Sequence, residues 1–285
     1  MAAIGLVVHH GRALAGRLAV EVGAWLEGQG HEVRVPATDA LAVGELARWS
    51  SPDPTFPTGL TLAVSIGGDG TMLRTVRLVH GTATPVLGVN VGHLGYLTEV
   101  EPSAWREALV RVLLGDYKVE ERMMLDISLL TANDAAPVSC TALNDAVVEK
   151  LEAGHTVRVG VTISGMTAVS YVADALIVAT PTGSTAYNLS AGGPLVSPRL
   201  EALVITPVAP HSLFGRAMIV ARDEVVRVEV LAGAAIVGVD GQRLGALGVG
   251  DVVECRAGAS TARLISFGER DFWRITKTKF GLNGQ

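Results

Sequence analysis

The chain has 285 residues, of which 49% are hydrophobic and only 18% are charged. This composition excludes an intrinsically disordered protein, because disordered chains are rich in charge and poor in apolar residues. The net charge is −5 and the sequence contains no basic run, which argues against a general nucleic-acid binder. No stretch approaches the ~18 apolar residues of a membrane span, and residues 4–8 resemble a first strand rather than a signal peptide. We therefore expect a cytoplasmic protein whose cysteines, Cys140 and Cys255, are reduced thiols.

The first hundred residues alternate between strand and helix patterns. Continuous apolar runs, as strands buried on both faces require, predict strands at residues 4–8 and 60–66, and two further strands are predicted at residues 31–35 and 85–89. Apolar residues at helical spacing predict helices at residues 14–26, 41–49 and 72–79. This alternation predicts a parallel sheet with helices on both faces. Ligands of such sheets bind at the carboxyl ends of the strands.

The pattern changes after a predicted helix near residues 105–114. From Lys118 onward, short segments rich in Val, Ile and Thr are separated by turn residues, which predicts a mainly antiparallel second domain. We expect an α/β domain over residues 1–110 and a β-rich domain over residues 111–269. A more polar tail at residues 270–285 is expected to fold back on the first domain.

The segment Gly67-Gly68-Asp69-Gly70-Thr71 follows a buried strand and opens a helix. Free N–H groups and the helix dipole favour anions there, and glycines let the backbone approach a phosphate closely and take positive φ. The spacing matches neither the dinucleotide fingerprint nor the Walker loop, so it predicts a different phosphate loop. Asp69 is placed to orient a hydroxyl nucleophile or to help hold a metal. The alternative is a tight turn with Asp69 as an N-cap.

Two further segments carry glycines and hydroxyls. Residues 88–97 follow the next predicted strand, so their glycines are expected at the same sheet edge as Gly67 to Gly70. Residues 174–190 form a strand followed by a dense cluster of small hydroxyl residues, which suit hydrogen bonds to phosphate, ribose or purine edges. Their alternative interpretations are an ordinary loop and a Ser/Thr-rich turn.

Taken in chain order, four segments resemble the motifs of the NAD kinase family: Gly67–Thr71, Asn144-Asp145, residues 174–198 and Val239-Asp240-Gly241-Gln242. The resemblance spans residues 63–242, and residues 180–194 are its most specific part, because lipid kinases share the glycine-aspartate loop. It implies phosphate transfer from ATP or polyphosphate, with a divalent metal such as Mg²⁺, to the 2′-hydroxyl of the adenosine ribose of NAD. It also implies a Rossmann-like N-terminal domain on the phosphate-donor side, a β-rich dinucleotide-binding domain, and a homodimer or homotetramer.

The resemblance also assigns roles to particular residues. Asp69 matches the proton acceptor, Gly70 lies beside the substrate, and Gly67 and Gly68 complete the phosphate cradle. Arg74 matches a basic position near the phosphates, with a solvated helix residue as its alternative. No residue is assigned as a metal ligand.

The remaining assignments concern the dinucleotide. Asn144 and Asp145 match an Asn-Glu pair that binds it, although the Asp is shorter, and a turn between strands is their alternative. His155 matches a basic position, with a structural histidine as the alternative, whereas Val172 stands where the family often has Arg. Asp174 matches a carboxylate that reads the dinucleotide and is a candidate for a contact across a subunit interface. The adenine-side loop and a late polar contact comprise Thr185, Ala186, Tyr187, Asn188, Ser190 and Gln242.

These residues are compatible with three functions: an NAD kinase, a lipid kinase with the same glycine-aspartate loop, and a non-catalytic NAD(P)-binding module. A lipid kinase would need an apolar groove and membrane affinity, and the sequence contains no basic amphipathic helix. The retained Asp69 favours a catalyst over a binding module. The choices between ATP and polyphosphate, NAD and NADH, and dimer and tetramer stay open at this point.

Overall fold

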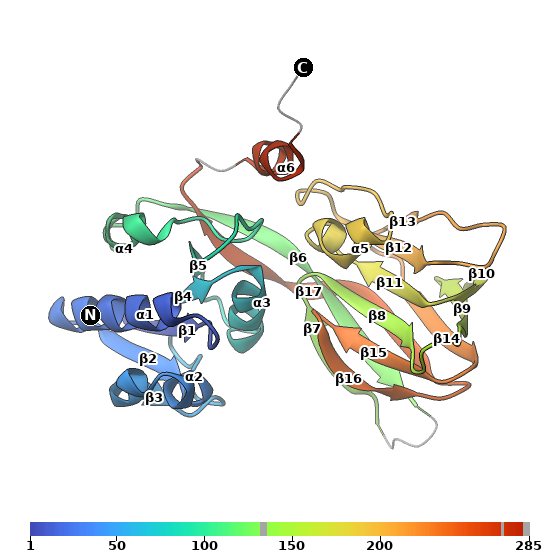
Figure 1. Cartoon of the computed structure of the whole chain (residues 1–285), viewed down its shortest axis with the longest axis horizontal. Helices are drawn as coiled ribbons and strands as arrows, with labels where there is room; N and C mark the ends of the chain where they lie inside the picture. The colour runs from blue at the N-terminus through green and yellow to red at the C-terminus, as the bar shows by residue number, and fades with distance from the viewer. Residues whose placement is uncertain (132–135, 269–270, 282–285) are drawn as a thin grey trace. The chain divides into compact units, whose positions relative to one another are not determined.

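A computed structural model describes residues 1–131, 136–268 and 271–281 of the chain (Figure 1). The chain divides into two compact units. The first contains Met1–Glu121 and the segment that begins at Ala262, and the second contains Arg122–Thr261. Two long strands, β6 (Lys118–Leu130) and β17 (Val252–Ser266), each carry the chain from one unit into the other.

A parallel sheet lies at the centre of the first unit, in the order β3–β2–β1–β4–β5. Every residue of β4 and β5 is buried, as their continuous apolar sequences require. The strands are β1 (Ala3–Val8), β2 (Glu32–Pro36), β3 (Ser50–Ser51), β4 (Leu62–Gly67) and β5 (Val86–Asn90). The predicted parallel sheet is therefore confirmed, and the carboxyl ends of β1, β4 and β5 lie at one edge.

Helices cover this sheet because their apolar residues recur on one face. The first helix buries Leu18, Val22 and Leu26, which are spaced by one helical turn. The helices of the first unit are α1 (Ala13–Gly28), α2 (Ala37–Ala42), α3 (Asp69–Leu78), α4 (Trp105–Leu113) and α6 (Phe272–Phe280), of which α1, α2 and α3 pack on strands of the sheet. Figure 1 shows α1, in blue, lying along β1.

The predicted helix at residues 41–49 is wrong. Helix α2 ends at Ala42, and a 3-10 turn follows over Gly44–Trp49. Val43 between them has an extended backbone, with φ −129° and ψ 92°. Its side chain packs so closely on Gly16 that a Cβ there would lie 3.2 Å from Val43 Cγ1. Tertiary packing of this β-branched residue thus interrupts the helical spacing.

The first unit extends beyond residue 110, where the sequence pattern changes. Val112 of α4 and Ile265 near the end of β17 both lie in the core of this unit. Helix α6 also contacts it, since Phe272 packs on Tyr96 with ring centroids 5.8 Å apart. Residues 111–121 and 262–268 therefore belong to the first unit rather than to the β-rich one, because apolar packing sets the division.

The second unit consists of antiparallel strands. Six of them form one sheet, in the order β13–β12–β11–β8–β15–β16, and β10, β9, β14 and β17 are neighbours in another, with β7 pairing with β6. Their bounds are β7 (Val138–Ala142), β8 (Asp145–Lys150), β9 (Val157–Ile163), β10 (Met166–Ala173), β11 (Ala175–Ala179), β12 (Ala202–Val208), β13 (Met218–Ala221), β14 (Val226–Ala232), β15 (Ala235–Val239) and β16 (Gln242–Leu247).

The core of the second unit lies between these two groups of strands. Val148 and Leu176 of the six-stranded sheet share one apolar cluster with Val159 and Val228 of the other group. The strand β11 is buried on both faces, because the segment that contains the short helix α5 (Tyr187–Ser190) covers its second face. Figure 1 shows α5 beside β11 and β12. Within the described residues, no helix has the length and apolarity needed to cross a membrane.

Candidate functional site

The glycine-aspartate loop joins the carboxyl end of β4 to α3. Gly67 is the last residue of β4 and pairs with Asn90, the last residue of β5. Gly68 occupies the N-cap of α3, and Asp69 is the first helical residue. The first N–H groups of a helix have no intrahelical partner and form the positive end of its dipole. This end of the sheet is therefore suited to an anionic ligand.

The carboxylate of Asp69 connects this loop to the segment that follows β5. Its Oδ2 accepts a hydrogen bond from the N–H of Tyr96 at 2.9 Å, and its Oδ1 accepts one from Leu97 at 3.0 Å. A Cβ on Gly95 would collide with Asp69 Oδ1, so only glycine permits this approach. Two segments that the sequence identified separately are thus held together by one carboxylate, and the N-cap alternative for Asp69 is wrong.

The glycines of the loop serve different purposes. A Cβ on Gly67 would collide with the side chain of Thr71, so this position needs glycine for packing. Gly68 has φ −110° and ψ −164°, and no atom lies within 4 Å of the position of its Cβ. The same space is open at Gly70. The expectation of positive φ at these glycines is wrong; the positive φ beyond β5 belongs to Gly92, at 143°.

Arg74 is engaged by a buried carboxylate. Its Nη1 and Nη2 donate to Asp39 Oδ1 and Oδ2 at 2.5 and 2.7 Å, and Nη2 also donates to the carbonyl of Val8 at 2.8 Å. The Asp39 side chain is fully buried and also receives His10 Nε2 at 2.7 Å. Burial raises the pKa of Asp39, but its hydrogen bonds to Arg74, His10 and Val8 outweigh burial and lower it. The solvated-helix alternative for Arg74 is therefore wrong.

In the second unit, three turns meet at one edge of the six-stranded sheet. Strand β8 is antiparallel to both β11 and β15, so its first residue lies beside their last residues. Asp145 pairs with Ala179, and Ala146 pairs with Val239. Sheet pairing thus brings the Asn144–Asp145 turn beside two other segments that the sequence singled out.

Asp240 fixes the backbone of the Asn144–Asp145 turn. Its carboxylate accepts hydrogen bonds from the N–H groups of Leu143, Asn144 and Asp145 at 2.9, 2.8 and 3.3 Å. Asp240 itself has φ 47°, a left-handed conformation that Asp tolerates better than most residues. Asp240 belongs to the sequence motif around Gln242, but it is not one of the predicted site residues. Its position directly after a strand is the sequence feature that could have identified it.

The side chain of Asp145 is buried without a partner. Its residue is 4% exposed, and among the described residues none donates a hydrogen bond to its carboxyl group. Burial, together with the nearby charge of Asp240, raises the pKa of Asp145 to about 7. Its oxygens are not among the fully enclosed, unsatisfied atoms, so they keep some access to solvent and are candidates for ligand contact.

Residues 180–183 pack directly on the same turn. Thr180 Oγ1 donates to the carbonyl of Leu143 at 2.6 Å and accepts from the N–H of Gly183 at 3.1 Å. A Cβ on Gly183 would collide with the backbone carbonyl of Asn144. The Asn144–Asp145 turn and the segment that leads into the predicted loop at Thr185 are therefore in contact, although Asn144 and Thr180 are 36 residues apart in the sequence.

The adenine-side loop divides into supporting and accessible residues. Asn188 is fully buried; its Nδ2 donates to Ser184 and Pro194 carbonyls, and Thr206 donates to its Oδ1 at 2.6 Å. Its amide is thus satisfied by the protein, and we assign it a structural role instead of the predicted ligand contact. Thr185 and Ala186 are half-buried, and Tyr187 is 40% exposed, so these residues can reach a ligand.

The remaining predicted residues lie elsewhere in the second unit. Asp174 precedes β11, at the opposite end of that strand from Thr180, and accepts from Lys150 Nζ at 2.6 Å. It is still close enough to Tyr187 that, after burial and Glu149, it helps to raise the pKa of Tyr187. His155 lies exposed in the turn after β8, where its Nε2 is 3.7 Å from Oε2 of Glu152. Ser190 and Gln242 are exposed.

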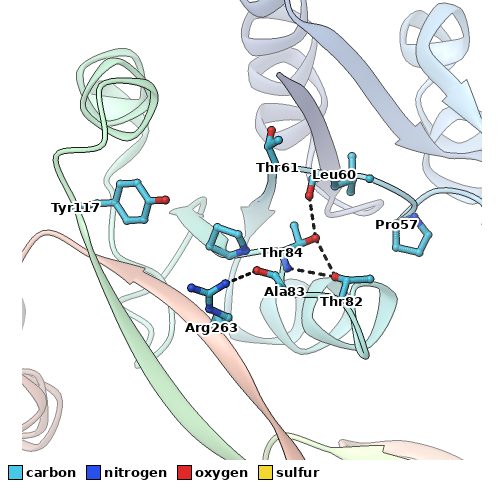
Figure 2. Close-up of a pocket in the computed structure, with 10 residues that line it drawn as sticks. Pro57, Leu60, Thr61, Thr82, Ala83, Thr84, Tyr117 and Arg263 are labelled. Carbon is cyan, nitrogen blue, oxygen red and sulfur yellow. Dashed lines mark hydrogen bonds between the residues drawn. The ribbon is translucent and has the colours of Figure 1, made fainter. Parts of the chain in front are cut away.

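A pocket of about 410 Å³ lies at the other end of the parallel sheet (Figure 2). Its lining residues Thr61 and Thr84 precede β4 and β5, whereas the glycine loop follows β4. Figure 2 shows that Thr84 donates to the carbonyl of Leu60 and Arg263 to that of Ala83, at 3.1 and 2.6 Å. These polar groups serve the protein itself, so the pocket is not the predicted phosphate site.

Among residues 1–131, 136–268 and 271–281, no group of three or more His, Cys, Asp or Glu side chains is arranged to hold a metal ion. Cys140 and Cys255 are free thiols. The site chemistry therefore consists of a carboxylate beside an anion-binding helix end in one unit and a polar, partly buried cluster in the other.

A parallel-sheet unit with this loop and a β-rich unit with this cluster define a nucleotide-dependent phosphotransferase. Models of the ATP-NAD kinase N-terminal domain and C-terminal domain match residues 4–117 and 143–267. The chain is 42% identical over 284 residues to an NAD kinase of Heliobacterium modesticaldum, covering 98% of both chains. It is 39% identical to an NAD kinase of Moorella thermoacetica, covering 100% of this chain and 91% of that one.

Solved structures agree with this relationship. Yeast NADH kinase complexed with NADH matches with a TM-score of 0.93 and 25% identity, over 100% of this chain and 89% of that one. An NAD kinase from Archaeoglobus fulgidus in complex with ATP has the same fold, with a TM-score of 0.74 and 24% identity. The chain belongs to the ATP-NAD kinase family and is an NAD kinase. The match decides against the lipid-kinase alternative.

Proposed function

We propose that the enzyme transfers the terminal phosphate of ATP to the 2′-hydroxyl of the adenosine ribose of NAD, giving NADP. The observation that carries this proposal is the carboxylate of Asp69, the first residue of α3, which the N–H groups of Tyr96 and Leu97 hold in place. Phosphoryl transfer depends on positioning, on neutralising the phosphate charge, and on a group that accepts the hydroxyl proton. Asp69 is suited to the last of these roles.

The geometry of Asp69 is consistent with a general base. Each carboxylate oxygen can accept more than one hydrogen bond, so Oδ1 and Oδ2 retain capacity beside the N–H groups of Tyr96 and Leu97. Because both bonds fix the carboxylate before the substrate arrives, little reorganisation is needed during proton transfer. The role of Gly67, Gly68 and Gly70 is then to let the start of α3 receive phosphate oxygens.

The second unit supplies the nucleoside contacts in this proposal. Asn144 and Asp145 hydrogen-bond the dinucleotide, and the Tyr187 ring packs on the base. Thr185, Ala186, Ser190 and Gln242 are accessible and complete the contact set. Asp174 reads the dinucleotide from its position beside Lys150. Arg74 acts mainly through Asp39, and His155 contacts the dinucleotide from an exposed turn.

A divalent metal, Mg²⁺, accompanies the ATP. Mg²⁺ retains several waters and binds one or two carboxylates together with substrate phosphates, so it needs no ready-made cluster of protein ligands. The residues present fit this kind of metal, and Asp69 is the carboxylate at the phosphate end of the first unit. When bound, Mg²⁺ neutralises charge on the phosphates. Polyphosphate presents the same phosphate chemistry and is a second donor to compare with ATP.

Assembly and location complete the proposal. We assign the enzyme to the cytoplasm as a homodimer or homotetramer, with no nucleic-acid partner. Leu213 and Phe214 are large apolar residues on the surface of the second unit, and Ile219 lies on the edge strand β13. Exposed apolar residues beside a sheet edge are typical of an interface between copies.

One incubation tests the catalytic proposal. The purified protein is mixed with ATP, Mg²⁺ and either NAD or NADH, and NADP or NADPH is measured enzymatically; parallel reactions contain polyphosphate instead of ATP. We expect NADP to form with ATP. Addition of EDTA, which removes Mg²⁺, should prevent its formation. Tight NAD binding without NADP formation would instead support the non-catalytic binding module.

A further inference from the structure

The strongest unassigned feature is the pair of carboxyl groups at the Asn144–Asp145 turn. Asp240 receives three backbone N–H groups, whereas the Asp145 carboxyl receives no hydrogen bond from the described residues. The two groups are neighbours, because the N–H of Asp240 also donates to the carbonyl of Asp145 at 3.1 Å. One acid is thus fully supported by donors, and the other is buried beside it with none.

This difference in surroundings determines where one proton resides. Hydrogen bonds from N–H groups favour the ionised form of a carboxyl, and burial beside a like charge favours the neutral form. Asp240 therefore retains the negative charge of the pair and Asp145 the proton. Because the two groups interact, the midpoint seen in a titration is a property of the pair, even though the proton resides mainly on Asp145.

A protonated carboxyl differs from a carboxylate in one decisive way: it can donate a hydrogen bond. The phosphates and the ribose and adenine acceptors of a dinucleotide are electron-rich, and a buried carboxylate would repel the phosphates. A neutral Asp145 next to Asn144 would present donors to such a ligand. This reasoning depends on the proposed function, since it takes a dinucleotide as the ligand.

We propose that Asp240 is a positioning residue for the dinucleotide, because it fixes the backbone of the Asn144–Asp145 turn and its neighbouring charge favours the protonated, hydrogen-bond-donating form of the Asp145 carboxyl. The other titratable groups near the pair are Tyr187 of α5, on which Asp145 acts, and Cys140 of β7, on which Asp240 acts. Burial, together with these charges, raises the pKa of both groups, so both stay neutral over the range in which Asp145 ionises.

Calorimetric titration of NAD in the absence of ATP, at pH values from about 5.5 to 8.5, tests this inference. If the donor is needed, the Kd for NAD rises roughly tenfold per pH unit above the midpoint of the pair, near the pKa of about 7. Asp240→Asn removes the neighbouring charge and should move that midpoint down by about one unit or more. Asp145→Asn keeps an N–H donor, so its Kd should stay constant across the range.

Asp251→Asn is the matched control. Asp251 is also a buried turn carboxylate of the second unit, and its Oδ2 accepts from the N–H of Gly248 at 2.8 Å. Its replacement should leave the midpoint of the titration unchanged. Circular dichroism identifies any variant that does not fold, and Asp145→Asn tests the donor role of Asp145 independently of Asp240→Asn.

Several results would overturn the inference. The first is a wild-type Kd for NAD that is constant with pH. The second is an Asp240→Asn variant that binds NAD more weakly at every pH but has the same midpoint as the wild type. The third is loss of NAD binding in a folded Asp145→Asn variant. The inference and the proposed function fail separately. Absence of NADP formation by the wild-type enzyme refutes the function, whereas active enzyme with an unmoved midpoint refutes only the role of Asp240.

Discussion

At the residue scale, single carboxylates in both units hold together segments that are distant in the sequence. Asp69 links the glycine loop to the segment after β5, and Asp240 holds the turn before β8. Asp39 engages Arg74 at the base of the same helix that carries Asp69. In each case an acid uses backbone N–H groups or a guanidinium that lie far away in sequence. The functional consequences can be tested one residue at a time.

Replacement of Asp69 tests the base. We expect Asp69→Asn to lower kcat by ~10²–10⁴, the usual worth of general-base assistance, because Asn cannot accept the proton. NAD affinity should change much less, since Asn144, Thr185 and Tyr187 remain. The rate of NADP formation at saturating ATP gives kcat, and calorimetry gives the Kd for NAD. A variant that retains more than about a tenth of wild-type kcat would remove Asp69 from this role.

Gly95→Ala provides the control for Asp69. Its Cβ collides with Asp69 Oδ1 and disturbs the loop, but it leaves the carboxylate chemistry in place. A rate loss as large as that of Asp69→Asn would mean that loop position, and not proton transfer, explains both results. We expect a smaller loss.

The two loop glycines should respond differently to substitution. Gly67→Ala should lower Tm, because its Cβ collides with Thr71, whereas Gly68→Ala should leave Tm nearly unchanged, because its surroundings are open and its φ is negative. Gly68→Ala should instead raise the KM for ATP, since the Cβ occupies space intended for a phosphate. Thermal melts and steady-state kinetics measure the two effects. Unchanged kinetics in Gly68→Ala would make Gly68 a simple turn residue.

At the element scale, the ends of strands and helices bring the chemistry together. Parallel pairing places the loops after β4 and β5 at one edge, and antiparallel pairing places the start of β8 beside the ends of β11 and β15. The ion pair between Asp39 of α2 and Arg74 of α3 then ties two helices to the carboxyl end of β1. Orientation of α3, and of Asp69 at its start, depends on this pair.

Breaking the Asp39–Arg74 pair should destabilise the first unit. Removing one partner of a buried pair leaves an unpaired charge and typically costs about 3–5 kcal/mol. Asp39→Asn should therefore lower the urea midpoint strongly, whereas Glu27→Gln, which breaks the exposed pair with Arg48, should cost about 0–1 kcal/mol. Equal effects of the two variants would contradict the structural role of the buried pair.

The same pair predicts a dependence of stability on pH. The pKa of Asp39 is lower in the folded protein than its usual value of 3.8, so the folded state binds fewer protons there than the unfolded state. The stabilisation is complete above that usual value and is lost as the pH falls below it through the folded pKa. Urea denaturation of wild type and Asp39→Asn at several acidic pH values measures it. The difference in stability between them should shrink with acidification.

At the scale of the whole molecule, assembly is the main expectation. Light scattering at assay concentrations should give a mass at least twice the 29.6 kDa of one chain. Leu213→Asp places a charge on the exposed apolar surface and should lower that mass, while Thr167→Asp on exposed β10 serves as a surface control. A wild-type monomer with full activity would contradict the proposal that copies of the chain associate.

The sequence by itself determined the order of elements and the family. Continuous apolar runs in the first hundred residues indicated strands buried on both faces, and their alternation with helices indicated a parallel sheet. The glycine-aspartate loop and residues 180–194 identified the phosphate and nucleoside segments, since these residue types and spacings are local properties. Local pattern failed at residues 41–49, where Val43 packs on Gly16 and interrupts the helix.

Only the tertiary structure decided which residues act together. Asp69 meets Tyr96, Arg74 meets Asp39, and Asp240 meets Asn144 across sequence separations of 27, 35 and 96 residues. No local periodicity encodes such contacts, because they follow from strand pairing and helix packing. The tertiary structure also shows that Asn188, predicted to contact the ligand, is buried and hydrogen-bonded within the protein. It shows as well that the carboxyl group of Asp145 receives no hydrogen bond from the described residues.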